Sequence, residues 1–272
     1  MPITIKAKRP WWQVNIREII AYRELLFTLV SRDIKVRYKQ TFLGIVWVIL
    51  QPLLAAGIFT LIFSNLIGTD LIDGVSYGAF VLCGFIFWQF FSTSVTTASG
   101  SVAEQIEIIK KVYFPRVYFP MAVIGRCFFD FLITFICLII VFYFTNTQFY
   151  ILGLMWSLLV LVALVFLAHG LSFLLSALNV KYRDVRHILP FFMQVWLYTS
   201  PVFYPDSILP ESLSFISRFN PIAVILNLIR QGIFHGVYDW VNLAIVLSGS
   251  FMVLLIGLIY FKNSEKAFAD IA

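Results

Sequence analysis

Long apolar stretches separated by short polar segments dominate the pattern of this chain. Charged side chains are absent from five stretches: residues 40–69, 74–103, 131–180, 187–205 and 240–261. A helix needs about 20 predominantly apolar residues to cross a hydrocarbon core of roughly 30 Å. Taken with the helix breakers, the pattern predicts six transmembrane helices, near residues 41–65, 79–100, 118–144, 151–178, 188–204 and 240–261. The fold class expected is therefore all-α integral membrane.

The segment before the first span has the pattern of an amphipathic helix lying on the membrane surface. Across residues 15–37, apolar side chains recur at helical spacing and charged ones fill the rest of the helical wheel. We assign five charged residues to this interface helix: Arg17, Arg32, Asp33, Lys35 and Arg37. A soluble cytoplasmic helix is the alternative. The short linker to the first span favours the membrane surface.

The distribution of Lys and Arg predicts the orientation of the chain. The first 40 residues hold nine of them, the loops at 101–117 and 179–187 hold three each, and the tail after residue 261 holds two. The three remaining loops together hold two. Because basic residues concentrate on the cytoplasmic side, both termini are expected in the cytoplasm. Residues 1–38 then form a cytoplasmic segment, 39–261 the transmembrane domain and 262–272 a cytoplasmic tail.

Composition excludes several classes of function. With 61% hydrophobic and 12% charged residues, the chain is unlike an ordinary soluble domain. Its net charge is +6, and the placement of the basic residues favours a membrane surface rather than nucleic acid as the partner. No glycine precedes a lysine, so a phosphate-binding GxxxxGK[ST] loop cannot exist here, and no HExxH or CxxC motif occurs. We therefore expect the chain to bind no cofactor or metal and to have no catalytic residues of its own.

One pair of charged residues is expected inside the membrane. Arg126 and Asp130 are four residues apart in the third predicted span, so on a helix they share a face and can neutralise each other. Contact with a substrate is the alternative role. Asp130 is the only acidic residue in the spans, whereas a proton-driven pump or a metal-dependent membrane transferase normally needs more.

The cytoplasmic loop 101–117 contains a short amphipathic helix candidate. Its charged and apolar residues fall on different sides, as expected for a helix that docks into a groove of a partner. Resting on lipid headgroups is the alternative. The residues concerned are Glu104, Ile106, Glu107, Ile108, Ile109, Lys110 and Lys111.

The external segment between the fifth and sixth spans is not an ordinary loop. Prolines punctuate it, and residues 222–233 are mostly apolar but too few to span a membrane. We expect two short re-entrant helices that act as a gate, with an external amphipathic helix as the alternative. The candidate gate residues are Arg218, Asn220, Pro221 and Arg230.

Aromatic residues make up 18% of the chain, more than interface belts require. Aromatic faces are suitable apolar contacts for the C–H faces of sugars. A pore lined with them would let a carbohydrate chain slide. The candidate channel residues are Trp47, Trp88, Trp196 and Tyr198, and packing between helices is the alternative role.

Four motifs occur in order between about residue 31 and residue 268. They are 31–41 (SRDIKVRYKQT) with 43–53, 111–116 (KVYFPR), 179–185 (NVKYRDV), and 200–205 (SPVFYP) with Asn220 and Pro221. These motifs resemble those of the type-2 ABC exporter permeases for O-antigen and related lipid-linked polysaccharides, and teichoic-acid and capsule exporter permeases share much of the pattern.

The resemblance implies a permease subunit in the bacterial inner membrane. A second copy of the chain and two copies of a separate ATPase subunit would complete the exporter, with ATP and Mg²⁺ held by the ATPase. The substrate implied is an undecaprenyl-diphosphate-linked polysaccharide of the O-antigen type. The helix near 104–114 would couple to the ATPase. A secondary transporter or a membrane-bound glycan enzyme is the alternative class, against which the scarcity of intramembrane acids counts.

Overall fold

The computed structural model describes residues 20–39, 44–67, 71–72, 74–105, 115–206 and 214–265. Helices make up nearly all of it, and a two-stranded antiparallel ribbon pairs Leu71 with Ser76. The elements in chain order are α2 (Arg23–Lys39), α3 (Gly44–Ile67), β1 (Leu71–Ile72), β2 (Val75–Ser76), α4 (Tyr77–Glu104), α6 (Tyr118–Phe144), α7 (Ile151–Lys181), α8 (Val185–Thr199), α9 (Ser214–Phe219), α10 (Pro221–Arg230), the π-helix η3 (Gln231–His235) and α11 (Trp240–Ser264).

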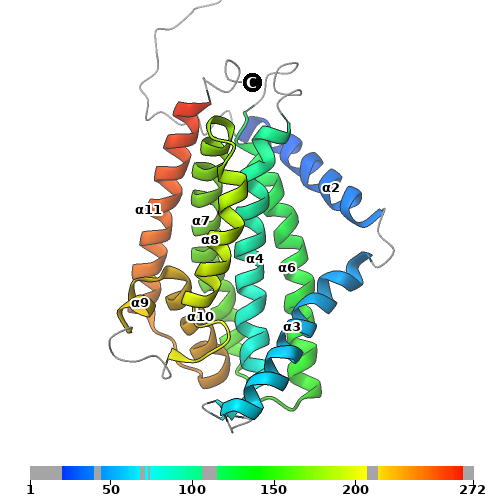
Figure 1. The fold of residues 1–272 in the computed structure, drawn as a ribbon, viewed down its shortest axis with the longest axis vertical. Helices are drawn as coiled ribbons and strands as arrows, with labels where there is room; N and C mark the ends of the chain where they lie inside the picture. The colour runs from blue at the N-terminus through cyan, green and yellow to red at the C-terminus, as the bar shows by residue number, and fades with distance from the viewer. Residues whose placement is uncertain are drawn as a thin grey trace, which may run out of the picture.

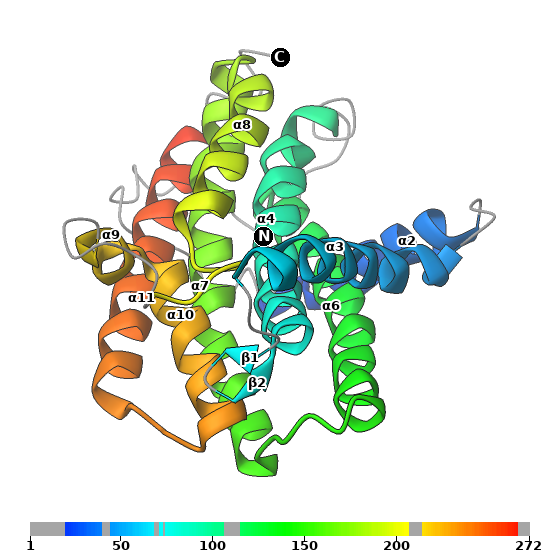
Figure 2. The same cartoon turned by 60° about the horizontal axis from the view of Figure 1, so that its bottom comes forward.

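The helices form a bundle with α4 at its centre. Helices α4, α6, α7, α8 and α11 run side by side along the long axis, while α3 is inclined at one end and α2 at the other (Figure 1). Helix α4 packs against α3, α6, α7, α8 and α10, and α11 packs mainly on α7. Helices α9 and α10 lie at the end of the bundle away from α2 (Figure 1), and Figure 2, in which that end comes forward, shows the β-ribbon there too.

Five helices of the described chain are long and apolar enough to cross a membrane: α3, α4, α6, α7 and α11. They correspond to the predicted spans one, two, three, four and six. The fifth predicted span, 188–204, overlaps α8, which begins three residues earlier and whose 15 residues extend only about 22 Å. Helix α8 ends at Thr199 because Ser200 precedes Pro201 and is extended. The crossing by this segment stays a prediction.

The described residues after α8 include the short helices α9 and α10; their re-entry into the membrane stays a prediction. Asn220 caps α10 by accepting a hydrogen bond from the backbone N–H of Ile222, and Pro221 occupies the first helical turn, where a missing N–H costs nothing. Helix α10 is buried against the bundle, with Ile225 and Ile229 fully inaccessible. The chain then turns at Gly236, whose φ of 65° favours glycine.

Helices α7 and α11 approach each other closely at two glycines. A Cβ atom on Gly170 would lie 2.6 Å from the backbone nitrogen of Leu254, and a Cβ on Gly257 would overlap the carbonyl oxygen of Gly170. Small residues allow this close approach. In a membrane, helices associate through such van der Waals contact, because lipid provides no hydrophobic driving force between them. The pair therefore fixes how α11 sits on the bundle.

Substituting Gly257 with Ala should lower the thermal stability of the purified protein by about 1–3 kcal/mol of unfolding free energy, because the added methyl group meets backbone atoms that cannot move aside. Gly249→Ala on the same helix is the matched control, since nothing lies within 4 Å of its added Cβ. Thermal unfolding of both variants in detergent tests this. Equal melting temperatures for the two variants would show that the α7–α11 contact is not tight.

Candidate functional site

A stripe of polar side chains runs along the half of α4 nearer α2. From residue 89 to residue 97, every α4 residue that is not buried carries a hydroxyl or an amide. The spacing of three and four residues places them on one helix face. We call this set the polar stripe: Gln89, Ser92, Thr93, Thr96 and Thr97. The other half of α4 is almost entirely buried, from Ala79 to Trp88.

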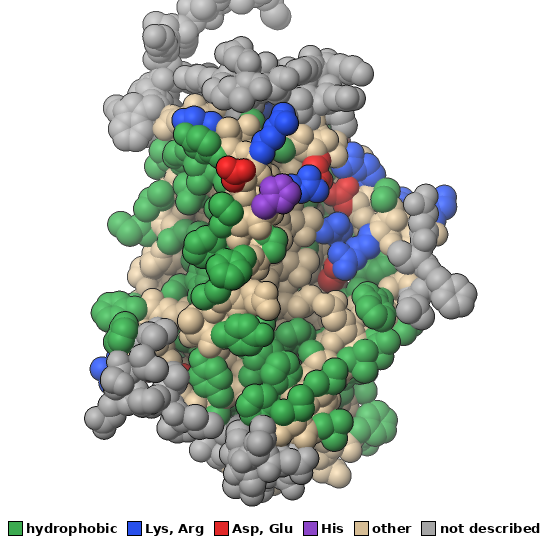
Figure 3. Space-filling model, in the orientation of Figure 1, with side chains coloured by type: hydrophobic (Ala, Val, Ile, Leu, Met, Phe, Trp, Pro, Cys, Tyr) green, Lys and Arg blue, Asp and Glu red, His purple; other side chains and the backbone are tan. Residues whose placement is uncertain are grey.

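Exposed apolar side chains also occur on α8 and α3, two helices that pack against α4. Helix α8 presents Phe191, Phe192 and Tyr198, and α3 presents Trp47 and Leu54. In Figure 3, green side chains border a paler central region of the visible face, and Lys, Arg, Asp and Glu gather toward its upper end. A polar strip between apolar walls is unusual for a surface that lipid tails would cover, because the tails cannot satisfy hydroxyl and amide groups.

The four candidate channel aromatics fall into two groups. Trp47 is 50% exposed and Tyr198 is 58% exposed, so both are open to whatever occupies this face. Trp88 is only 3% exposed and packs at 5.8 Å from the ring of Phe91. Trp196 packs edge-on to the same ring and donates its indole N–H to Asn220 Oδ1 at 2.9 Å. The contacts of Trp88 and Trp196 favour the packing alternative for these two residues.

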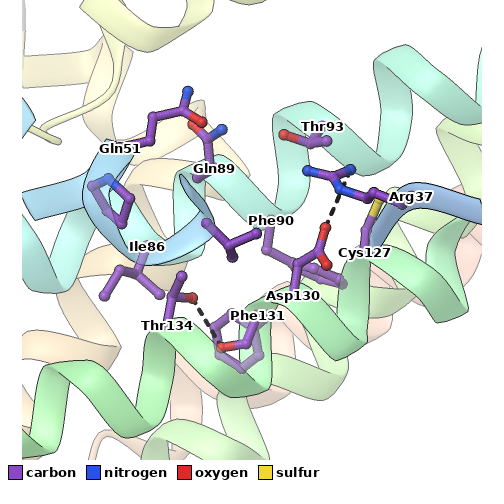
Figure 4. Close-up of a pocket in the computed structure, with 12 residues that line it drawn as sticks. Arg37, Gln51, Ile86, Gln89, Phe90, Thr93, Cys127, Asp130, Phe131 and Thr134 are labelled. Atoms are coloured by element: carbon purple, nitrogen blue, oxygen red, sulfur yellow. Dashed lines mark hydrogen bonds and ion pairs between the residues drawn. The ribbon is translucent and has the colours of Figure 1, made fainter. Parts of the chain in front are cut away.

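A small pocket of mixed polar and apolar lining lies beside the polar stripe, where α2, α3, α4 and α6 meet. It encloses about 60 Å³, enough for a few water molecules. Figure 4 shows Gln51 and Gln89 on one side of this pocket, and the ion pair of Arg37 with Asp130 on the other, with Thr93 near Arg37. The pocket gives polar groups at membrane depth a place to be solvated.

The predicted pair of Arg126 with Asp130 does not form, and this corrects the sequence interpretation. Asp130 instead faces α2, where Arg37 Nη1 lies 3.3 Å from its Oδ2 and the hydroxyl of Tyr38 donates to its Oδ1. Burial, together with this hydrogen bond, raises the pKa of Tyr38, so that its hydroxyl stays protonated and can donate. The spacing of the two residues on α6 is as predicted, but a tertiary contact supplies nearer partners.

At the opposite end of the bundle, Arg230 is buried without a carboxylate among the described residues within ion-pair distance. Its Nη2 donates to the carbonyl of Val202 at 2.7 Å and of Phe80 at 3.1 Å, and its Nη1 donates to that of Pro201. The guanidinium also lies over the ring of Phe80, 3.6 Å from the centroid. Gly84 makes this possible, because a Cβ there would overlap the guanidinium. We call these contacts the Arg230 clamp.

Of the other candidate gate residues, Asn220 is part of a buried hydrogen-bond network and Arg218 is exposed. Asn220 joins α10 to the end of α8, since it donates to Ser200 Oγ at 2.9 Å as well as accepting from Trp196. The clamp and this network together hold α10, the turn after α8 and α4 in one unit. Arg218 is not part of it and is exposed on α9.

Most of the predicted coupling segment and part of the interface helix lie outside the described residues. These are Ile106, Glu107, Ile108, Ile109, Lys110, Lys111 and Arg17. Of the others, Glu104 lies at the end of α4 with Oε1 3.7 Å from Arg186 Nη2. On α2, Arg32 pairs with Asp33 at 2.9 Å, and Lys35 is exposed.

Sequence reasoning missed the polar stripe, although a signal for it exists. Helix α4 has the lowest mean hydropathy of the five long apolar helices, and residues 92–101 contain seven Ser or Thr. Their absence of charge hid them within an apolar run. The role of Gly84 leaves no comparable signal, because its neighbour Arg230 is 146 positions away in the chain.

Comparison with known proteins identifies the family of the chain. The sequence pattern of the ABC-2 type transporter family matches residues 24–234. An O-antigen export system permease protein of Klebsiella pneumoniae is 30% identical over 91% of this chain and 95% of its own length. A protein of the same description from Myxococcus xanthus is 27% identical over 94% of this chain and 98% of its own, and the polysialic acid transport protein of Escherichia coli is 25% identical over 88% and 93%. The chain, a multi-pass inner-membrane protein, belongs to the ABC-2 type transporter family.

Proposed function

We propose that this chain is the permease subunit of an ATP-driven exporter that moves a lipid-linked polysaccharide of the O-antigen type across the inner membrane. The relatives named O-antigen export permeases support the substrate class. The observation that carries the proposal is the polar stripe on α4 between exposed aromatic side chains. Hydroxyl and amide groups exchange hydrogen bonds readily with sugar hydroxyls, and aromatic rings contact sugar C–H faces. Such contacts are numerous and interchangeable, as a sliding polymer requires.

A second copy of the chain is needed to enclose the path. On one protomer the side chains of the polar stripe are partly exposed, and lipid tails would leave their hydroxyls unsatisfied. A two-fold symmetric dimer would place two such faces opposite each other, as in most homo-oligomers. The exposed aromatics Trp47 and Tyr198 would then border a shared channel, while Trp88 and Trp196 support it from within each protomer.

The energy source is expected on a separate subunit. The chain has no Gly–Lys dipeptide and so no phosphate-binding loop of the usual ATPase type. The segment near 104–114 remains the proposed docking site for that ATPase, which would hold ATP and Mg²⁺. Glu104 and Arg186 mark the end of the bundle where α4 and α8 would face it.

The proposed orientation puts this end in the cytoplasm and the Arg230 clamp outside. In a background whose three native cysteines are replaced, Arg183→Cys should react with an impermeant thiol reagent only after permeabilisation. Gln148→Cys, exposed in the turn between α6 and α7, should react in intact spheroplasts. Labelling in the reverse order would overturn the orientation and the side assigned to every loop.

Deleting the gene tests the proposed function in cells. We expect the polysaccharide to disappear from the surface and to accumulate, still attached to its lipid, on the cytoplasmic side. The relatives named polysialic acid transport proteins favour capsule polysaccharide as the second candidate substrate. The kind of polymer lost from the surface separates the two. Unchanged surface glycans of every kind would refute both.

A further inference from the structure

A groove opens between α2, α4 and α6 beside the cytoplasmic end of the polar stripe. Its cavity volume is about 380 Å³, larger than the small pocket beside Asp130. Apolar side chains such as Leu29, Val36 and Val123 line part of it, and Arg126 and Thr97 line another part. A lining that combines apolar surface with a cation suits an amphiphile with an anionic head.

Most charges around this groove have partners of opposite sign. The two carboxylates that line the groove are both paired, Asp33 with Arg32 and Glu104 with Arg186, and the nearby Asp130 pairs with Arg37. Arg126 differs: within the described ranges, no carboxylate lies within ion-pair distance of it. Its Nε is buried with no hydrogen-bond partner there, and its Nη2 reaches only the thiol of Cys127, at 4.0 Å. A guanidinium has five N–H donors and no acceptor, so Arg126 can donate to an anion here. The described residues supply no such counter-ion.

The position of Arg126 makes the lack of a counter-ion costly. It lies about two helical turns from the start of α6, or about 12 Å along the axis, and so within the third predicted span. Charged side chains at such depth pair with other charges or line watery cavities. Phosphate is the anion that a guanidinium binds best, through two parallel hydrogen bonds.

We propose that this groove binds the diphosphate of the lipid carrier of the polysaccharide, with Arg126 as its guanidinium contact. The identity of the lipid rests on the proposed function. Thr97 belongs to both the groove and the polar stripe, so a diphosphate held at Arg126 sets the first sugar at the cytoplasmic start of the stripe. A bulk anionic phospholipid carries one phosphate and no sugar, so it would make no contact with the polar stripe and should bind the groove more weakly.

The test measures binding of undecaprenyl diphosphate to the full-length protein in nanodiscs of neutral lipid, for example by native mass spectrometry. We expect Arg126→Gln to weaken binding at least tenfold and Arg126→Lys, which keeps the charge, to weaken it less. Arg218→Gln is the matched control, because it removes one positive charge from an exposed position at the other end of the bundle. Undecaprenol, which lacks phosphate, should bind weakly to all variants.

Three results would overturn the inference. They are equal binding of undecaprenyl diphosphate by the Arg126→Gln variant and the wild type, equal binding of undecaprenol, and displacement by phosphatidylglycerol at equal concentration. If Arg126→Gln does not fold, Thr97→Trp is the second test. It fills the groove from α4, leaves the arginine in place and should also weaken binding of undecaprenyl diphosphate. The binding test contains no ATPase and no polymer. Failure of this inference, seen as unchanged binding by the variants, is therefore distinguishable from failure of the proposed function, seen as unchanged surface polysaccharide after gene deletion.

Discussion

Replacing Arg230 with Ala should abolish export and lower the stability of the purified protein by at least about 3 kcal/mol. The side chain is buried and donates to three backbone carbonyls, two of them in the turn after α8 and one in α4. Removing it leaves buried acceptors without donors, and hydrogen bonds to a charged donor contribute about 1.5–3 kcal/mol each. The turn after α8 would then lose its attachment to α4.

Gly84→Ala should have the same effect from the other side of the clamp. Its methyl group would occupy the space of the guanidinium, whereas Gly57→Ala, with nothing within 4 Å of the added Cβ, is the matched control. Arg230→Lys should be only partly active, because a single ammonium cannot hold carbonyls in the planar arrangement of a guanidinium. Surface polymer and melting temperature are the measurements. Normal export by Arg230→Ala and Gly84→Ala would show that the clamp is not needed.

Placing a tryptophan on the polar stripe should block the path of the polymer. We expect Thr96→Trp to reduce surface polysaccharide more than tenfold while the protein still inserts and still supports ATP hydrolysis by its partner. Thr96→Val, which removes only the hydroxyl, should reduce export less than threefold, because the contacts of a sliding chain are interchangeable. Ile245→Trp is the control for bulk, since Ile245 is 62% exposed on α11, away from α4.

Full export by Thr96→Trp would mean that the polar stripe does not line the path. Loss of export together with loss of insertion would show instead that the stripe has a packing role. Chain length of the exported polymer provides a finer readout, because a narrowed path slows every unit of a long polymer and affects short chains less.

Much of the helical architecture follows from the sequence because membrane crossing needs a fixed length of apolar chain. The predicted span 118–144 coincides with α6, and 240–261 lies within α11. The ends of α4 and α7 extend three or four residues beyond the predicted cytoplasmic limits, since helices continue into the headgroup region. The end of α8 was predicted less well, because the predicted span runs to residue 204 whereas the helix ends at Thr199.

The contacts between distant segments could not be predicted in the same way. The partner of Asp130 comes from α2, and periodicity on α6 alone pointed to Arg126. Arg230 was expected in a gate, but its carbonyl acceptors and the glycine beside it depend on how α4 and α10 pack. The polar stripe was missed because Ser and Thr do not interrupt an apolar run, although together on one face they change its character.

The most direct test of the central claim is transport in proteoliposomes that contain this chain and its ATPase partner. A lipid-linked polysaccharide added on the side of the ATPase should reach the opposite side, where a lectin or glycosidase detects it, only when ATP and both subunits are present. A partner unable to hydrolyse ATP should give none. Transport by this chain alone under an ion gradient, or movement of the polymer without ATP, would contradict the account.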